Sequence, residues 1–188
     1  MLTALTGGIG AGKSTVLEIF RELGAETKDT DTEVHKIYEE DNEIHRLLKE
    51  KWGSKVFTDD LPDRKKIAGV VFGNKENLEW LNGVMHPRVR QKISKVNKEG
   101  LTVIAVPLLF EVNWQSYFDN VISVWCSTSK QIPRLLKRGW TQEEIDRRLS
   151  AQMNQDEKLS RANFGIINNW TMQSLTRQCR IIFTKLYN

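Results

Sequence analysis

A glycine-rich stretch near the N-terminus constrains this chain more than any other feature. It reads GGIGAGKS at residues 7–14 and satisfies the pattern G-x-x-x-x-G-K-[ST]. The apolar segment from Leu2 to Leu5 predicts a buried strand before it. Val16, Phe20 and Leu23 recur at helical spacing after it, and Gly24 can end that helix. The order of strand, glycine loop and helix predicts an α/β fold with a phosphate site at the start of the helix.

The residue types of this loop suit a bound phosphate chain, whereas a chance glycine-rich turn would not explain the flanking elements. Glycines let the backbone approach an anion and turn its N–H groups toward it, and the helix N-terminus adds positive charge. Lys13 would reach the β- and γ-phosphates, and the Ser14 hydroxyl would ligate Mg²⁺. We therefore predict that a nucleoside triphosphate binds at Gly8, Gly10, Ala11, Gly12, Lys13, Ser14 and Thr15.

The length and composition of the chain limit the other function classes. Its 188 residues suit one α/β domain with an insertion, and the net charge of +4 favours anionic partners. The basic residues are dispersed, so we expect no nucleic-acid partner. No apolar segment is long enough for a membrane span and no leader is evident, which predicts a cytoplasmic protein. We separately expect a monomer or weak oligomer.

Cys126 and Cys179 are too far apart in sequence to indicate a metal site or a disulfide framework. The six tryptophans are scattered and form no stacking series. We therefore expect the cysteines to be reduced and the tryptophans to be core or half-buried anchors.

Two carboxylates follow the first helix at Asp29 and Asp31. A parallel sheet requires a second strand over residues 25–31, and these acids would stand at its carboxyl end, where ligands of open α/β sheets bind. One acid could accept a proton from an attacking hydroxyl, and the other could hold Mg²⁺ or the acceptor. Alternatively, the acids form a turn in which Asp31 or Thr32 caps the next helix.

Residues 32–90 form a charged, helical pattern that we interpret as an insertion. Breaks occur at Gly53, at residues 59–62 and at residues 73–74, and His86-Pro87 is expected to close the segment in a turn. Arg88 and Arg90, which follow, could grip a diphosphate or be solvated.

The most apolar stretch of the chain predicts a buried central strand at Val103–Val106. Pro107 would end it, and the turn Pro-Leu-Leu-Phe-Glu at residues 107–111 would form either a wall for substrate or an acidic position near Mg²⁺. A further strand is expected at residues 121–126 and a last short strand at residues 164–167. A final helix from about residue 171 would present Leu175, Cys179, Ile182 and Leu186 on one face.

Residues 134–158 are interpreted as a helical lid. Thr128 with Gln131 and Thr141 with Glu144 fit capping boxes for two helices, which Gly139-Trp140 separates. These helices carry Arg134, Lys137, Arg138, Arg147 and Arg148. Closure over a γ-phosphate would neutralise charge and exclude water, although a solvated helical hairpin would carry the same residues.

The assembled residues resemble the dephospho-coenzyme A kinases over nearly the whole chain. The matching positions are residues 5–15, Asp29, Asp31, Arg64, Val71, Phe72, Leu81, His86, Pro87, residues 107–111, Gln131, Arg134, Arg138, Gly139, Gln152, Lys158, Ala162, Ile167 and Asn168. The loop is common to many families, whereas its combination with the His-Pro pair and the 107–111 turn is specific. The polar residues 26–28, Asn163 and Asn168-Asn169 depart from the family pattern.

The resemblance implies a three-layer P-loop kinase core with a parallel sheet at residues 1–31 and 100–188. It also implies a helical coenzyme-A-binding insertion at 32–90 and a lid at 134–158. The reaction would be the ATP-dependent, Mg²⁺-assisted phosphorylation of the ribose 3′-hydroxyl of 3′-dephospho-coenzyme A, which completes coenzyme A synthesis. By the same resemblance Asp31 would be the base or the group that orients the hydroxyl, and Lys13 and Arg138 would stabilise the transferring phosphoryl group. The substrate-binding positions would be Asp29, Arg64, His86 and Glu111.

Three other functions compete with this interpretation. A nucleoside monophosphate or sugar kinase would share the loop, the acids and the lid. A guanine-nucleotide switch would need N-K-x-D after a strand, whereas the nearest string here is Asn-Lys-Glu-Asn at residues 74–77. A nucleic-acid-dependent ATPase would need an apolar strand ending in Asp-Glu, which the sequence lacks.

Overall fold

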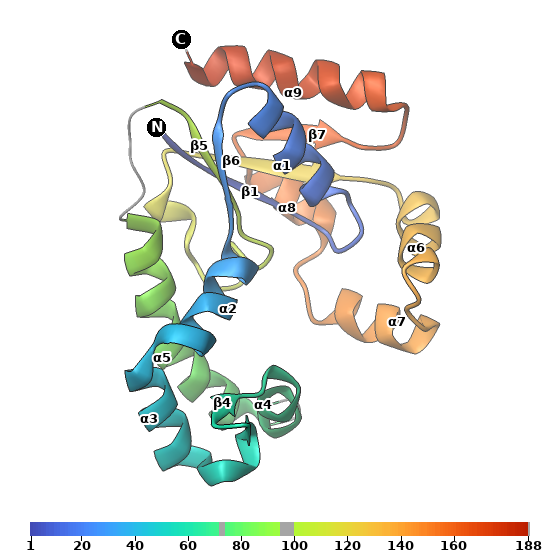
Figure 1. Ribbon diagram of the computed structural model, residues 1–188. Helices are drawn as coiled ribbons and strands as arrows, with labels where there is room; N and C mark the ends of the chain where they lie inside the picture. Colours follow the sequence, from blue (N-terminus) through green and yellow to red (C-terminus); the bar gives the residue numbers. More distant parts are fainter. Residues whose placement is uncertain (72–73, 95–99, 188) are drawn as a thin grey trace. The chain divides into compact units, whose positions relative to one another are not determined.

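The computed structural model describes residues 1–71, 74–94 and 100–187 (Figure 1). The chain divides into two compact units, one formed by Met1–Asp29 with Asn97–Asn188 and one formed by Thr30–Val96. We refer to the first as the sheet unit and to the second as the helical unit. Phe72, one of the positions that resemble the kinase family, lies outside the described residues.

The sheet unit contains a five-stranded parallel sheet. Its strands are β1 (Leu2–Gly7), β2 (Glu26–Asp29), β5 (Thr102–Ala105), β6 (Asn120–Trp125) and β7 (Phe164–Ile167), in the order β2-β5-β1-β6-β7. Its helices are α1 (Lys13–Glu22), α6 (Thr128–Lys137), α7 (Gln142–Ser150), α8 (Gln155–Arg161) and α9 (Met172–Tyr187), with a 3₁₀ turn at Gln115–Tyr117. The α/β fold with a parallel sheet is therefore confirmed.

Helices cover both faces of this sheet, which gives three layers. On one face Leu5 and Ile122 pack with Phe20 of α1 and Leu175 of α9 in one buried cluster. The opposite face carries Ala4, Ile104 and Ser123, each at most 1% exposed, and α8 contacts β1 and β6 (Figure 1). Strands buried on both sides read as continuous apolar runs, as β5 and β6 do.

The phosphate loop occupies the switch point of the sheet. The chain passes from β1 through α1 to β2 on one side, and β6 pairs with β1 on the other. Ligands of open α/β sheets bind outside the carboxyl ends of the strands where the order reverses, and the loop follows the carboxyl end of β1.

The helical unit is built from α2 (Thr30–Glu40), α3 (Asn42–Trp52), α4 (Arg64–Val71) and α5 (Lys75–Ser94). A 3₁₀ turn at Gly53–Val56 leads into a small hairpin of β3 (Phe57–Thr58) and β4 (Leu61–Pro62). The break expected at residues 59–62 is the turn of this hairpin, where Asp59 and Asp60 both have positive φ. Trp52 and Trp80 meet edge to face with centroids 5.0 Å apart.

Three local expectations are wrong. The two acids do not share a strand end, because α2 begins at Thr30, so that Asp29 ends β2 and Asp31 lies in the first turn of the helix. His86-Pro87 makes no turn and lies inside α5, where Arg88 Nη1 donates to the Val84 carbonyl at 2.7 Å. No capping box forms at Thr128, because Ser127 is the N-cap of α6 and the amide of Gln131 is used elsewhere.

Arg88 was expected either to grip a diphosphate or to be solvated, and instead it forms ion pairs within the helical unit. Its guanidinium pairs with Asp41 at 3.0 Å and with Glu43 at 3.1 Å, and its side chain is 19% exposed. These contacts join the start of α3 to α5, so a structural role accounts for Arg88.

Several other expectations are confirmed. The capping box of Thr141 and Glu144 is present at the start of α7, and Gly139 with φ 83° follows the end of α6. The four apolar residues expected on one face of the last helix are all buried in α9. Among the described residues, no helix combines the length and the apolar content that a membrane span requires.

Candidate active site

The glycines of the phosphate loop are required by close backbone approaches. At the end of β1, Gly7 has φ 146°, and a Cβ added there would lie 2.2 Å from the carbonyl oxygen of Val124 on β6. Gly12 has φ 103° and is the N-cap of α1, and its added Cβ would lie 2.2 Å from Asn168 Nδ2. A side chain at either position would push the loop away from the strands that hold it.

Lys13 fixes the first half of the loop from within. Its Nζ donates to the carbonyl of Gly7 at 2.9 Å and to that of Gly8 at 3.0 Å. The ammonium therefore lies over the loop, close to the start of α1, where a helix presents N–H groups without intrahelical partners.

Side chains from outside the loop donate hydrogen bonds to the next three carbonyls. Gln131 Nε2 donates to the Ile9 carbonyl at 2.5 Å, Arg134 Nη1 to that of Gly10 at 3.5 Å, and Asn168 Nδ2 to that of Ala11 at 2.8 Å. Together with Lys13, these donors pair five consecutive carbonyls of the loop. These bonds hold the carbonyls of the loop in place, and the N–H groups at the start of α1, which have no intrahelical partners, can serve an anion.

Two glutamines near α6 and α7 bind the loop at Ile9. Gln131 lies on α6 and is 2% exposed, whereas Gln152 follows α7. Ile9 N–H donates to Gln152 Oε1 at 3.2 Å, while its carbonyl accepts from Gln131. Both ends of the α6–α7 pair are thus anchored to the phosphate loop.

A pocket of about 290 Å³ opens beside the loop. It is lined by Gly10, Gly12, Thr15, Arg134, Arg138, Asn168, Trp170, Met172 and Leu175. Three predicted loop residues and Arg138 therefore share one pocket. Arg138 is the C-cap of α6, and its side chain is exposed, so a guanidinium stands next to the loop.

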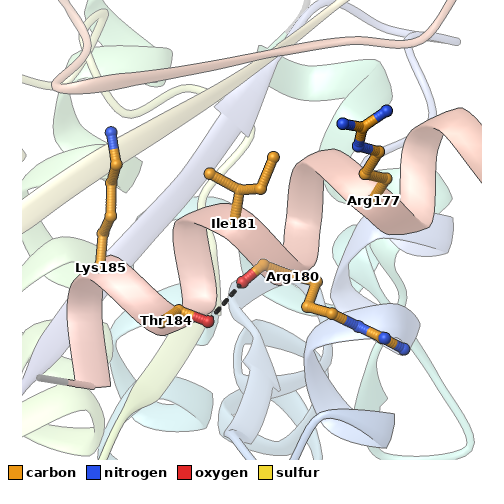
Figure 2. Close-up of a pocket in the computed structure, with 5 residues that line it drawn as sticks. All are labelled: Arg177, Arg180, Ile181, Thr184 and Lys185. Carbon is orange, nitrogen blue, oxygen red and sulfur yellow. Dashed lines mark hydrogen bonds between the residues drawn. The ribbon is translucent and has the colours of Figure 1, made fainter.

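A larger hollow of about 490 Å³ lies elsewhere in the sheet unit (Figure 2). All five residues that line it come from α9: Arg177, Arg180, Ile181, Thr184 and Lys185. The Thr184 hydroxyl donates to the Arg180 carbonyl within the same helix. No residue of the phosphate loop borders it, so we assign the candidate active site to the smaller pocket.

The turn after β5 is tied to α8 by a buried ion pair. Lys158 is fully buried, and its Nζ lies 2.7 Å from Glu111 Oε1 and 2.7 Å from the Pro107 carbonyl. Glu111 Oε1 also accepts from the N–H of Met153 at 3.0 Å, whereas Oε2 is buried without a hydrogen-bond partner among the described residues. The carboxylate predicted to bind substrate is therefore engaged in holding its own turn.

The other predicted substrate residues divide between the two units. Asp29 is half-buried at the carboxyl end of β2 in the sheet unit, whereas Asp31, Arg64 and His86 belong to the helical unit. Asp31 and Arg64 are exposed. The charge of Arg64 partly offsets the burial that raises the pKa of Tyr38, which places the two side chains near each other. Burial lowers the pKa of His86, so its imidazole is neutral at pH 7.

Cys126 lies under the loop, with its Sγ 4.0 Å from the Gly10 carbonyl. Burial raises the pKa of this thiol, and the nearby charges of Arg134 and Lys13 oppose that rise. The thiol is thus a neutral packing group, as the sequence predicted.

The sequence did not assign Gln131, Gln152, Asn168 or Trp170 to the site. Asn168 directly follows the last strand, and that position at the carboxyl edge of a parallel sheet was the available signal. Gln131 and Gln152 stood out only as positions that match the family pattern, and their residue type did not indicate these contacts, which depend on the fold of α6 and α7. Trp170 contradicts the expectation of a buried or half-buried anchor, because it is 67% exposed.

Comparisons with known proteins agree on one family. A family model described as dephospho-CoA kinase matches residues 1–174. A dephospho-CoA kinase of Geobacillus kaustophilus is 37% identical over 183 residues, which cover 93% of this chain and 90% of the relative.

Two solved structures are similar to the chain over almost its whole length. The crystal structure of TT1252 from Thermus thermophilus has a TM-score of 0.87 at 29% identity and covers 100% of this chain and 98% of its own. A dephospho-CoA kinase from Campylobacter jejuni has a TM-score of 0.73 at 26% identity, with 99% and 96% covered. The similarity therefore extends over both units of the chain.

Proposed function

The chain belongs to the dephospho-CoA kinase family, and from that premise we propose how its own residues divide the work of the reaction. The protein is a phosphotransferase that uses ATP to phosphorylate dephospho-CoA in coenzyme A biosynthesis. Membership in this family disfavours the other small-molecule kinases and the nucleotide switch. The observation that best supports the assignment of roles is the phosphate loop, whose five consecutive carbonyls are all paired with side-chain donors beside the pocket that contains Arg138.

We assign the triphosphate of ATP to the loop residues Gly8 through Thr15. The N–H groups at the start of α1 would bind the phosphate oxygens, and Lys13 would move from the loop carbonyls to the β- and γ-phosphates. The exposed Ser14 hydroxyl at the start of α1 suits Mg²⁺, which keeps several waters and takes few protein ligands when it binds with a nucleotide. The metal would neutralise phosphate charge.

The acceptor in this proposal is the ribose 3′-hydroxyl of dephospho-CoA. Asp31 would take the proton from that hydroxyl as its oxygen forms a bond to the γ-phosphorus, while the bond from that phosphorus to the β–γ bridging oxygen breaks and ADP leaves. Lys13 and Arg138 would stabilise the negative charge on the transferring group. The remaining acid, Asp29, would contact the acceptor.

Arg64 and His86 are proposed to contact other parts of dephospho-CoA. An arginine suits its phosphate groups, whereas His86 would form hydrogen bonds in its neutral state because burial lowers its pKa. Glu111 was predicted to bind substrate, but its carboxylate is paired with Lys158. We propose that Glu111 supports the acceptor site mainly by fixing the 107–111 turn.

Residues 134–158 are proposed to act as a lid that closes over ATP and excludes water. Ile9 is bound by Gln152, which lies in this segment, and by Gln131, which lies just before it on α6. These contacts support the proposal, because movement of α6 and α7 would be transmitted to the loop. We further propose that the enzyme acts in the cytoplasm as a monomer or weak oligomer, on small molecules and not on nucleic acid or membranes. Sedimentation at several concentrations would measure its oligomeric state.

Asp31→Asn tests the central role in this proposal. Loss of a general base typically costs about 10²- to 10⁴-fold in rate, so kcat should fall by that factor while the Kd of ATP stays within about twofold. Asp60→Asn is a matched control, because Asp60 is an exposed aspartate of the β3–β4 turn and asparagine tolerates its positive φ of 61°. An equal loss of ATP binding in Asp31→Asn would show that Asp31 holds the metal or the local fold and does not act as the base.

A further inference from the structure

Trp170 is an exposed aromatic residue at the wall of the phosphate-loop pocket. It follows Asn168 and Asn169 at the carboxyl edge of the sheet and lines the pocket together with Gly12, Thr15 and Arg134. Its relative exposure of 67% is the highest among the large hydrophobic residues described as exposed. Met172, which lines the same pocket, is 59% exposed, so the two side chains leave apolar surface in water at one pocket.

The backbone on the N-terminal side of Trp170 is firmly held. The N–H of Asn168 donates to the Trp125 carbonyl at 2.7 Å, and the Asn169 Oδ1 accepts from the N–H of Ser127 at 2.8 Å. The two residues that precede Trp170 are therefore tied to the chain at the end of β6, which fixes the backbone from which the indole projects.

The backbone on the C-terminal side is held as well. The carbonyl of Thr171 accepts the N–H of Leu175 at 3.1 Å, and its hydroxyl accepts the N–H of Ser174 at 3.3 Å, so Thr171 caps α9. An exposed ring on a backbone that is fixed on both sides is preorganised to receive a flat partner, because little chain entropy is lost when the partner binds.

The surroundings of the ring indicate the chemistry of that partner. Met172 and Leu175 extend the apolar wall, whereas Arg134 donates to the Asn168 carbonyl at 3.1 Å and thereby brings a planar cation to the same pocket. Aromatic rings and guanidinium planes both stack on nucleobases. The polar loop residues Gly10, Gly12 and Thr15 complete the lining, so one pocket offers a phosphate cradle and an apolar, aromatic wall.

We propose that the indole of Trp170 is the stacking surface for the purine base of the bound nucleotide. This inference rests on the proposed assignment of ATP to the phosphate loop and adds a binding residue to it. Stacking is tolerant of the base because every base has a π-face, so Trp170 contributes affinity for ATP and for GTP alike. It contributes nothing to the binding of a polyphosphate that lacks a base.

The test compares Trp170→Ala and Trp170→Phe with the wild-type enzyme by titration calorimetry. The ligands are the Mg²⁺ complexes of ADP, GDP, a non-hydrolysable ATP analogue and inorganic tripolyphosphate. Tyr187→Ala serves as a control for removing an exposed aromatic from the same unit, because Tyr187 is 61% exposed at the end of α9 and borders neither pocket. Thermal unfolding of each variant checks that the fold is retained.

We expect Trp170→Ala to weaken the nucleotides by roughly 5- to 100-fold and tripolyphosphate by less than twofold. Trp170→Phe should keep nucleotide affinity within about fivefold of the wild type, and Tyr187→Ala should change neither affinity. Unchanged nucleotide affinity in Trp170→Ala would overturn the inference while leaving the proposed site intact. An equal loss of tripolyphosphate would also overturn it, because Trp170 would then act on the loop. If the wild type bound no nucleotide and no tripolyphosphate, the proposed assignment of ATP to the loop would itself fail.

Discussion

Replacing Lys158 by methionine removes a buried cation that joins α8 to the turn after β5. Its ammonium lies 2.7 Å from Glu111 Oε1 and 2.7 Å from the Pro107 carbonyl, and its side chain has no exposed surface. Methionine fills a similar volume but leaves the Glu111 carboxylate without its cation. Removing one partner of a buried ion pair costs about 3–5 kcal/mol, because the other charge remains desolvated.

The expected loss lies at the lower end of this range. The Glu111 side chain is 19% exposed and its Oε1 keeps the hydrogen bond from the Met153 N–H, so we expect Lys158→Met to lower the free energy of unfolding by about 3 kcal/mol. For a chain of this length each kcal/mol corresponds to about 2–4 °C, which gives a fall in Tm of about 6–12 °C. Tryptophan fluorescence during urea and thermal unfolding would measure both quantities.

A double-mutant cycle with Glu111→Gln isolates the pair itself. Glutamine is uncharged, so the double variant no longer buries an unpaired carboxylate and should be about 2 kcal/mol more stable than the sum of the single losses predicts. Losses that simply add would refute the argument that this ion pair holds the turn. The same variants give the KM for dephospho-CoA, which would show whether the acceptor site depends on the turn.

Three further predictions follow from single contacts or titrations. Gly12→Ala places a Cβ 2.2 Å from the nearest side chain at φ 103° and should weaken ATP at least about tenfold in a binding titration, whereas Gly69→Ala in α4, whose Cβ would meet nothing within 4 Å, should not. Burial lowers the pKa of His86, so the unfolded chain binds the proton first and stability should fall as the pH drops from about 6.5 toward that lowered pKa. His86→Gln should flatten this acid limb of the urea-unfolding profile, and an unchanged slope would contradict it. Burial raises the pKa of Cys126 and raises that of Cys179 to about 12, so a thiol reagent at pH 8 should label both only after unfolding.

Sequence patterns predicted the parts of this fold that depend on local chemistry. The phosphate loop, the β5 and β6 strands, the capping box at Thr141 and the buried face of α9 all follow from residue type and periodicity. The second strand was predicted only because a parallel sheet needs one. Its sequence, Glu-Thr-Lys-Asp, is polar because β2 is an edge strand of the sheet.

The errors arose where tertiary context overrides local preference. Pro87 suggested a turn, yet a long helix tolerates it when its neighbours are packed, and Met85 and Val89 beside it are 5% and 2% exposed. Asp31 suggested a strand end or a cap, whereas the helix starts one residue earlier, at Thr30, which is itself buried.

The donors that surround the phosphate loop were the least predictable part of the site. Gln131 is 122 residues and Gln152 is 143 residues from Ile9, which both bind. Asn168 is 157 residues from Ala11. No local pattern encodes contacts at such separations. They arise only when the parallel sheet brings the ends of β1, β6 and β7 to one edge.

The central claim is that this chain transfers phosphate from ATP to dephospho-CoA. The most direct measurement is ADP formation from Mg-ATP with 3′-dephospho-CoA as acceptor, compared with adenosine, AMP, CMP and gluconate. We predict turnover with 3′-dephospho-CoA alone, and a product that carries the new phosphate on the ribose 3′-oxygen. Turnover with one of the other acceptors, and none with 3′-dephospho-CoA, would contradict the account.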